Sequence, residues 1–132
     1  MDIKVSDIAY KQLLSFVTYY AEHFSLQAAN HLADSFEDKM EYLSRFPETG
    51  HPEPLAEDLD TLFRSIRIAK HINVVYCIDY VEDCVKVCDI WDTRMSPERL
   101  KRRLTRSRRF CPSFFCLCLR NTRKKQRLCA RE

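Results

Sequence analysis

Six side chains in the middle of the chain are of types that act on anions. They are Arg64, Arg67, Lys70, His71, Tyr76 and Arg94. A guanidinium binds phosphate or carboxylate through paired hydrogen bonds, an ammonium acts as a flexible point charge, and an imidazole can exchange a proton near neutral pH. If the fold brings these residues together, they predict a site that grips a phosphate or a carboxylate.

Strand alternation separates the two arginines that lie closest in sequence. Arg64 shares a face with the apolar Ile66. Arg67 shares the other face with the smaller Ser65 and Ala69. Arg67 is therefore the cation that we expect on the more open face.

The remaining candidates each have a structural alternative. Lys70 and His71 fall at a turn between two predicted strands, where they could reach a bound phosphate or be solvated turn residues. Arg94 could bind a phosphate or form an ion pair with Asp92. We interpret Tyr76 as a core residue, because aromatic residues in mid-strand usually pack inside.

Apolar residues at helical spacing predict two helices near the N-terminus. A short strand is expected at Ile3–Val5, and Ser6 can cap the first helix. Ser25 can cap a second helix, which Pro47 must end. We expect the two helices to form a hairpin.

Three segments rich in β-branched and aromatic residues follow a loop that contains Gly50. They are Leu62–Ala69, Ile72–Val81 and Cys84–Trp91. They predict a three-stranded antiparallel meander. The order of elements predicts an α+β fold, in which an N-terminal helical hairpin packs on one face of a small antiparallel β-sheet and a partner binds the other, partly open face.

Charge divides the chain into two parts. Residues 1–94 hold nine Lys/Arg against seventeen Asp/Glu, and residues 95–132 hold thirteen against two. Ser96 and Pro97 predict a short basic helix that ends at Leu104. We therefore expect a domain at 1–104 and a basic, cysteine-containing C-terminal tail at 105–132 that is disordered or irregular.

The basic tail suits an anionic partner. The candidates for contact with nucleic acid or another anionic surface are Lys101, Arg102, Arg103 and Arg106. Three interpretations stay open: a nucleic-acid-binding module, a segment that lies on a membrane surface, and an extension with no binding role. No apolar run is long enough to cross a bilayer.

The seven cysteines favour reduced thiols in a cytoplasmic protein, because the N-terminus has no apolar leader. Cys77, Cys84 and Cys88 lie in predicted strands, where we expect them to be buried as small hydrophobic residues. The four cysteines of the tail lack paired CxxC spacing, so we predict no metal site and no cofactor.

Three segments are similar to one protein family. They are RFPETGHPEPL at Arg45–Leu55, FRSIRIAKHINVVYCID at Phe63–Asp79 and IWDTRMSPERL at Ile90–Leu100. Following a helical hairpin in this order, they resemble the RelE/ParE superfamily of bacterial type II toxin–antitoxin systems. The resemblance implies a growth-inhibiting toxin that a cognate antitoxin neutralises, and it leaves a homodimer and a heterotetramer with the antitoxin both open.

The superfamily acts in two ways. RelE-like members cleave mRNA on the ribosome without a metal, whereas ParE-like members inhibit DNA gyrase. If this chain were a nuclease, the resemblance would imply catalytic roles for Arg67, Lys70, His71 and Arg94. In either case it implies that Arg64, Arg67 and Arg94 contact the antitoxin or the target.

Two departures count against the nuclease. RelE-like enzymes carry an arginine where Asn73 stands, and a tyrosine where this chain has Met95–Leu100. A neutral amide cannot replace a guanidinium opposite a developing phosphate charge. We therefore favour a ParE-like inhibitor of gyrase or a divergent member. The alternatives are a RelE-like ribosome-dependent mRNA endonuclease and a nucleic-acid-binding module that is not a toxin.

Overall fold

The elements follow the order expected from the sequence. The computed structural model describes residues 1–57, 59, 61–110 and 114–117, with side chains described up to residue 105. The elements are β1 (Asp2–Ser6), α1 (Asp7–His23), α2 (Leu26–Arg45), β2 (His51–Pro52), the 3-10 turn η1 (Pro54–Ala56), β3 (Arg64–Ala69), β4 (Ile72–Asp79), β5 (Cys84–Asp92), α3 (Pro97–Phe110) and β6 (Phe114–Leu117). Most of the predicted extension at 105–132, with the side chains of its cysteines, lies outside this description, so the division at Leu104 stays a prediction.

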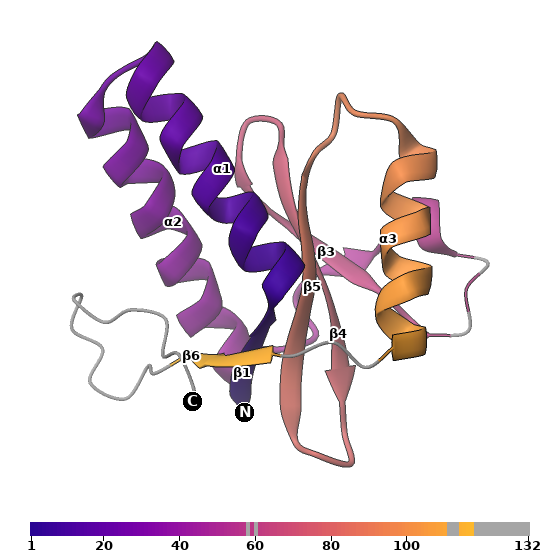
Figure 1. The fold of residues 1–132 in the computed structure, drawn as a ribbon. Coiled ribbons are helices and arrows are strands. Elements are labelled where there is room, and N and C mark those ends of the chain that lie inside the picture. Colours follow the sequence, from indigo (N-terminus) through magenta and orange to yellow (C-terminus); the bar gives the residue numbers. More distant parts are fainter. Residues whose placement is uncertain (58, 60, 111–113, 118–132) are drawn as a thin grey trace.

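The strands form one mixed sheet in the order β2-β3-β4-β5-β1-β6 (Figure 1). β3, β4 and β5 make the antiparallel meander that the sequence predicts. β1 adds a parallel pair that it does not predict, with Ile3 opposite Val85 of β5, and β6 pairs antiparallel with β1. Parallel neighbours need a long connection between them, and the helical hairpin and the meander together supply it.

Both helices of the hairpin begin at the serines expected to cap them. The Ser6 hydroxyl accepts a hydrogen bond from the backbone N–H of Ala9 at 3.1 Å, and Ser25 accepts one from Ala28 at 3.0 Å. These caps satisfy backbone donors that a helix start leaves unpaired. α2 ends at Arg45, shortly before Pro47, as predicted.

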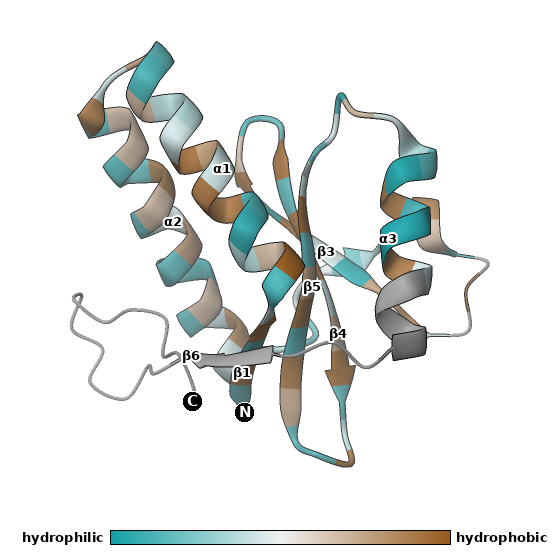
Figure 2. Cartoon of the chain, viewed as in Figure 1, coloured by the Kyte–Doolittle hydropathy of each residue, from teal (hydrophilic) through white to brown (hydrophobic). Residues whose placement is uncertain are grey.

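The main core lies between the hairpin and the sheet. Phe36 and Met40 of α2 are almost fully buried against Ile3 of β1 and Val74 of β4. Figure 2 shows hydrophobic residues concentrated along the strands that the hairpin covers. This packing fixes the meander, and with it the positions of the polar residues that alternate with the core residues.

α3 and η1 cover part of the other face, which the sequence predicted to be partly open (Figure 1). Leu100 and Leu104 of α3 are fully buried and pack with Val75 and Trp91 in a second core cluster. α3 ends at Phe110 and not at Leu104, because arginine and lysine favour helices even where the apolar period stops. No helix within the described ranges combines the length and the apolar character needed to cross a membrane.

Candidate functional site

The two arginines of β3 lie on opposite faces of the sheet. Arg64 pairs in register with Tyr76, on the hairpin side, and is half-buried. Its guanidinium donates hydrogen bonds to the backbone carbonyls of Gly50 at 2.7 Å and Glu48 at 3.2 Å. Arg64 therefore holds the loop between α2 and β2 in place.

Tyr76 stabilises the same loop, which confirms its interpretation as a core residue. Its ring is fully buried, and its hydroxyl donates to the carbonyl of Pro47 and accepts from the N–H of Gly50, both at 2.8 Å. A Cβ atom at position 50 would lie 2.8 Å from the carbonyl oxygen of Ser65 and would also clash with the tyrosine hydroxyl. Only glycine fits this close approach.

Arg67 lies on the α3 face and is exposed, as expected from alternation. It pairs in register with Asn73, which in turn pairs with Trp91, so the three residues form a row across β3, β4 and β5. Within the described part of the chain, the amide oxygen of Asn73 and the indole N–H of Trp91 are buried and have no hydrogen-bond partner. Arg67 makes no ion pair or hydrogen bond among the described side chains.

The turn residues Lys70 and His71 lie at the same end of the sheet as Arg94, which follows β5. Lys70 and His71 form the β3–β4 turn, and the carbonyl of His71 accepts a hydrogen bond from the N–H of Thr93 at 2.7 Å. The register also sets Ile72 opposite Asp92. The β3–β4 turn and the β5–α3 exit therefore lie side by side.

Arg94 is held in the ion pair with Asp92 that was its structural alternative. Its Nε and Nη2 atoms donate to the two carboxylate oxygens at 3.0 and 2.7 Å, and its backbone N–H donates at 2.9 Å. The hydrogen bond from Arg94 lowers the pKa of Asp92, and the charge of His71 contributes in the same direction. Asp92 is therefore the counter-ion of Arg94 in the folded chain.

Arg103, one of the candidate anion contacts, forms a buried ion pair with β5. Its Nε and Nη2 atoms lie 2.6 and 3.1 Å from the two carboxylate oxygens of Asp89, whose side chain is fully buried. Burial raises the pKa of Asp89, and the hydrogen bond from Arg103 opposes that shift. A guanidinium in this position stabilises the docking of α3 and is not available to a phosphate.

The other candidates on α3 differ in exposure. Arg102 is exposed and Lys101 is half-buried, whereas the side chain of Arg106 lies outside the described residues. The sequence did not predict the Asp89–Arg103 pair. Its signal is Asp89, a charged residue with apolar neighbours on both sides in β5, since a buried carboxylate needs a cation near it.

The described residues at this end of the sheet supply cations and one imidazole, that of His71. Arg67, Lys70 and Arg94 provide positive charge beside the imidazole of His71. Among the described side chains, no group of three His, Cys, Asp or Glu residues lies close enough together to hold a metal ion. The arrangement therefore suits electrostatic recognition of a carboxylate-bearing or phosphate-bearing surface.

Comparison with known proteins gives one family. A family model described as ParE toxin of type II toxin–antitoxin system, parDE, matches residues 3–97. No curated protein matches the chain. The matched region runs from β1 to the first residue of α3, so it includes the whole cation cluster and excludes nearly all of the helix that covers the second face.

Proposed function

We propose that this chain, which belongs to the ParE toxin family of type II toxin–antitoxin systems, inhibits growth by binding DNA gyrase and not by cutting RNA. Membership of the family confirms the resemblance to RelE/ParE toxins and implies a cognate antitoxin as a partner. The identity of the target is the part that we infer from the arrangement of the site.

The proposal rests on an incomplete set of groups for RNA cleavage and on the separation of Arg64 from the other predicted cations. Cleavage of RNA by its own 2′-hydroxyl needs a base, an acid and cations that converge on one phosphate. Arg64 is bound to loop carbonyls on the hairpin side, whereas Arg67 lies on the α3 side. The two guanidinium groups cannot act on the same phosphate.

The remaining groups are also incomplete as a catalytic set. Asn73 stands opposite Arg67, where it offers a neutral amide, and Arg94 is neutralised by Asp92. Loss of one donor to a transition-state oxyanion costs about 3–4 kcal/mol, a factor of several hundred or more in rate. A chain that lacks two such donors keeps a binding surface and loses most of the capacity for cleavage.

The exposed cations at the end of the sheet fit a binding role. Arg67 and Lys70 are exposed, and the side chain of Arg94 is 68% exposed although it is paired with Asp92. We assign these three residues to contact with the antitoxin or with gyrase. Arg64 would contribute indirectly, by holding the loop that contains Gly50.

Two assays on the purified chain test the proposal. We expect the protein to inhibit DNA supercoiling by gyrase and to leave mRNA intact on translating ribosomes. An Arg67→Glu variant should lose inhibition, and Arg102→Glu, a charge reversal at another exposed position, should keep it. Cleavage of ribosome-bound mRNA with no effect on gyrase would refute the proposal.

A further inference from the structure

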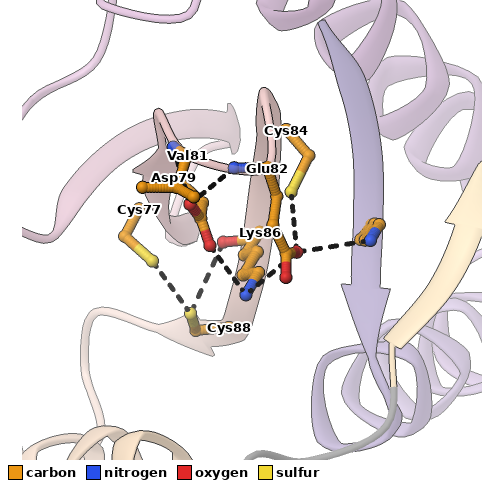
Figure 3. A network of polar contacts seen from close by, with 8 residues as sticks. Cys77, Asp79, Val81, Glu82, Cys84, Lys86 and Cys88 are labelled. Carbon is orange, nitrogen blue, oxygen red and sulfur yellow. Dashed lines mark hydrogen bonds and ion pairs between the residues drawn. The ribbon is translucent and has the colours of Figure 1, made fainter.

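Two cysteine thiols beneath α3 lie within reach of each other (Figure 3). Cys77 of β4 and Cys88 of β5 are both free, and their sulfur atoms are 4.0 Å apart. A disulfide needs about 2.05 Å between the sulfurs. The two sulfurs are thus about 2 Å farther apart than in a disulfide, and rotation of the two side chains would have to bring them together.

A β-bulge gives Cys88 its position. Val75 pairs with Asp89 and the next residue, Tyr76, pairs with Val87, so Cys88 is an extra residue in β5. Bulges bend a strand locally and redirect its side chains, and they recur near functional positions. Here the bulge places Cys88 in the core cluster beneath α3, next to the buried carboxylate of Asp89.

The two thiols differ in environment. Cys77 is half-buried, and its register partner is Lys86, whose ammonium also pairs with Asp79 at 3.1 Å. The hydrogen bond from Cys88 lowers the pKa of Cys77, and the charge of Lys86 acts in the same direction against the effect of burial. Cys77 is therefore the thiol with the greater thiolate character and the greater access to solvent.

Cys88 has the opposite properties. It is only 6% exposed, and the hydrogen bond to Cys77 and its burial both raise its pKa. Its sulfur also lies 3.4 Å from the carbonyl oxygen of Lys86, so its single hydrogen can be donated to either acceptor. A reactive, accessible thiol therefore stands beside a protected one, which is the arrangement of an attacking and a resolving cysteine.

We propose that Cys77 and Cys88 form a peroxide-sensitive dithiol that closes to an intramolecular disulfide. The Cys77 thiolate attacks one oxygen of hydrogen peroxide, the O–O bond breaks, and the products are a sulfenic acid and water once a proton is taken up. The Cys88 thiol then attacks the Cys77 sulfur, an S–S bond forms, and the sulfenic oxygen leaves as a second water. In sum, two thiols are oxidised and one peroxide is reduced.

Peptide mapping of the full chain tests the proposal. Cleavage after Lys70, Glu82, Lys86 and Arg94 places Cys77, Cys84 and Cys88 on three separate peptides. After treatment with hydrogen peroxide, we expect the Cys77 and Cys88 peptides to be joined, with the loss of two hydrogens and reversal by dithiothreitol. Links that involve only Cys84 or the tail cysteines, or no link between Cys77 and Cys88, would overturn the proposal.

Cysteine variants separate the role of Cys77 as the attacking thiol from that of Cys88 as the resolving thiol. The matched control is Cys84→Ser, which lies in the same sheet. Cys84→Ser should keep the link. Cys88→Ser should lose it and accumulate a sulfenic acid on Cys77 that dimedone traps. If Cys88→Ser does not fold, alkylation of the wild-type protein serves instead: Cys77 should react at least about tenfold faster than Cys84, because thiolate fraction and exposure both favour it. Equal rates would contradict the assignment.

Discussion

The two faces of the sheet are built differently. On the hairpin side the described core cluster is made of apolar side chains and the ring of Tyr76, whose hydroxyl has both a donor and an acceptor as partners. On the α3 side the smaller core contains a buried ion pair, and three buried polar atoms there, those of Ser65, Asn73 and Trp91, lack hydrogen-bond partners within the described residues. The first face is therefore built mainly by apolar packing, whereas the second combines apolar packing with buried polar groups.

The largest difference between the faces should appear when each core loses one large side chain. Phe36→Ala opens a cavity in the hairpin core and should cost about 3–5 kcal/mol in free energy of unfolding. Leu100→Ala should cost about 2 kcal/mol, because α3 packs at the edge of the domain and can move into the space. Urea denaturation measures both. Equal losses would mean that α3 is as tightly integrated as the hairpin.

Disruption of the Asp89–Arg103 ion pair on the α3 face should make the stability of the protein depend on pH. Arg103→Met leaves the Asp89 carboxylate buried without its cation and should cost about 3 kcal/mol at neutral pH. Burial already raises the pKa of Asp89, and removal of Arg103 raises it further, so the folded variant favours the protonated acid. Its stability should therefore be greatest at acid pH and fall as pH rises through that raised pKa.

A double variant is the control for this interpretation. Asp89→Leu combined with Arg103→Met replaces the pair by apolar side chains and should recover most of the lost stability. Thermal unfolding between pH 4 and pH 8 provides the measurement. A single Arg103→Met variant with a flat pH profile would show that Asp89 reaches solvent in the folded state.

On the hairpin face, removal of the Tyr76 hydroxyl should have a smaller effect on stability. Tyr76→Phe deletes the hydroxyl that binds the carbonyl of Pro47 and the N–H of Gly50. It should cost about 1–2 kcal/mol in free energy of unfolding, because the ring still fills the core while two loop groups lose their partner. The rate of amide hydrogen exchange should increase most at Gly50, whose N–H loses its acceptor. Unchanged exchange there would mean that Arg64 alone holds the loop.

Substitutions among the cations Arg67, Lys70 and Arg94 should have the smallest effects on stability. Arg94→Ala removes a side chain that is 68% exposed, and the Asp92 carboxylate keeps its hydrogen bond from the backbone N–H of residue 94. We expect a melting temperature close to that of the wild type, together with a marked loss of growth arrest when the variant is expressed. A variant that melts normally and stays fully toxic would remove Arg94 from the binding surface.

Much of the fold could be predicted because local signals agreed with the tertiary structure. Ser6 and Ser25 cap helices, Pro47 follows the end of one, and the three strands of the meander pair in the predicted order. The parallel pairing of β1 with β5 and the packing of α3 on the sheet depend on contacts between distant segments, which periodicity does not reveal. Half of the α3 residues are also basic, which concealed the buried positions of Leu100 and Leu104.

The candidate site could be predicted only in part. Alternation correctly placed Arg64 and Arg67 on different faces, and the preference of mid-strand aromatic residues for the interior placed Tyr76 in the core. It could not show that Arg103 would be buried against Asp89, because that pairing depends on where α3 docks. Cys84 and Cys88 are buried as predicted, whereas Cys77 is half-buried at the margin of the second core cluster.

DNA topology in cells tests the central claim most directly. Expression of the toxin without its antitoxin should relax a reporter plasmid while growth stops, and the antitoxin should restore supercoiling. The Arg67→Glu variant should leave the plasmid supercoiled. Growth arrest with normal supercoiling and with mRNA cut within codons would contradict the account, because it would require RNA cleavage by a site in which a neutral amide, Asn73, stands opposite Arg67.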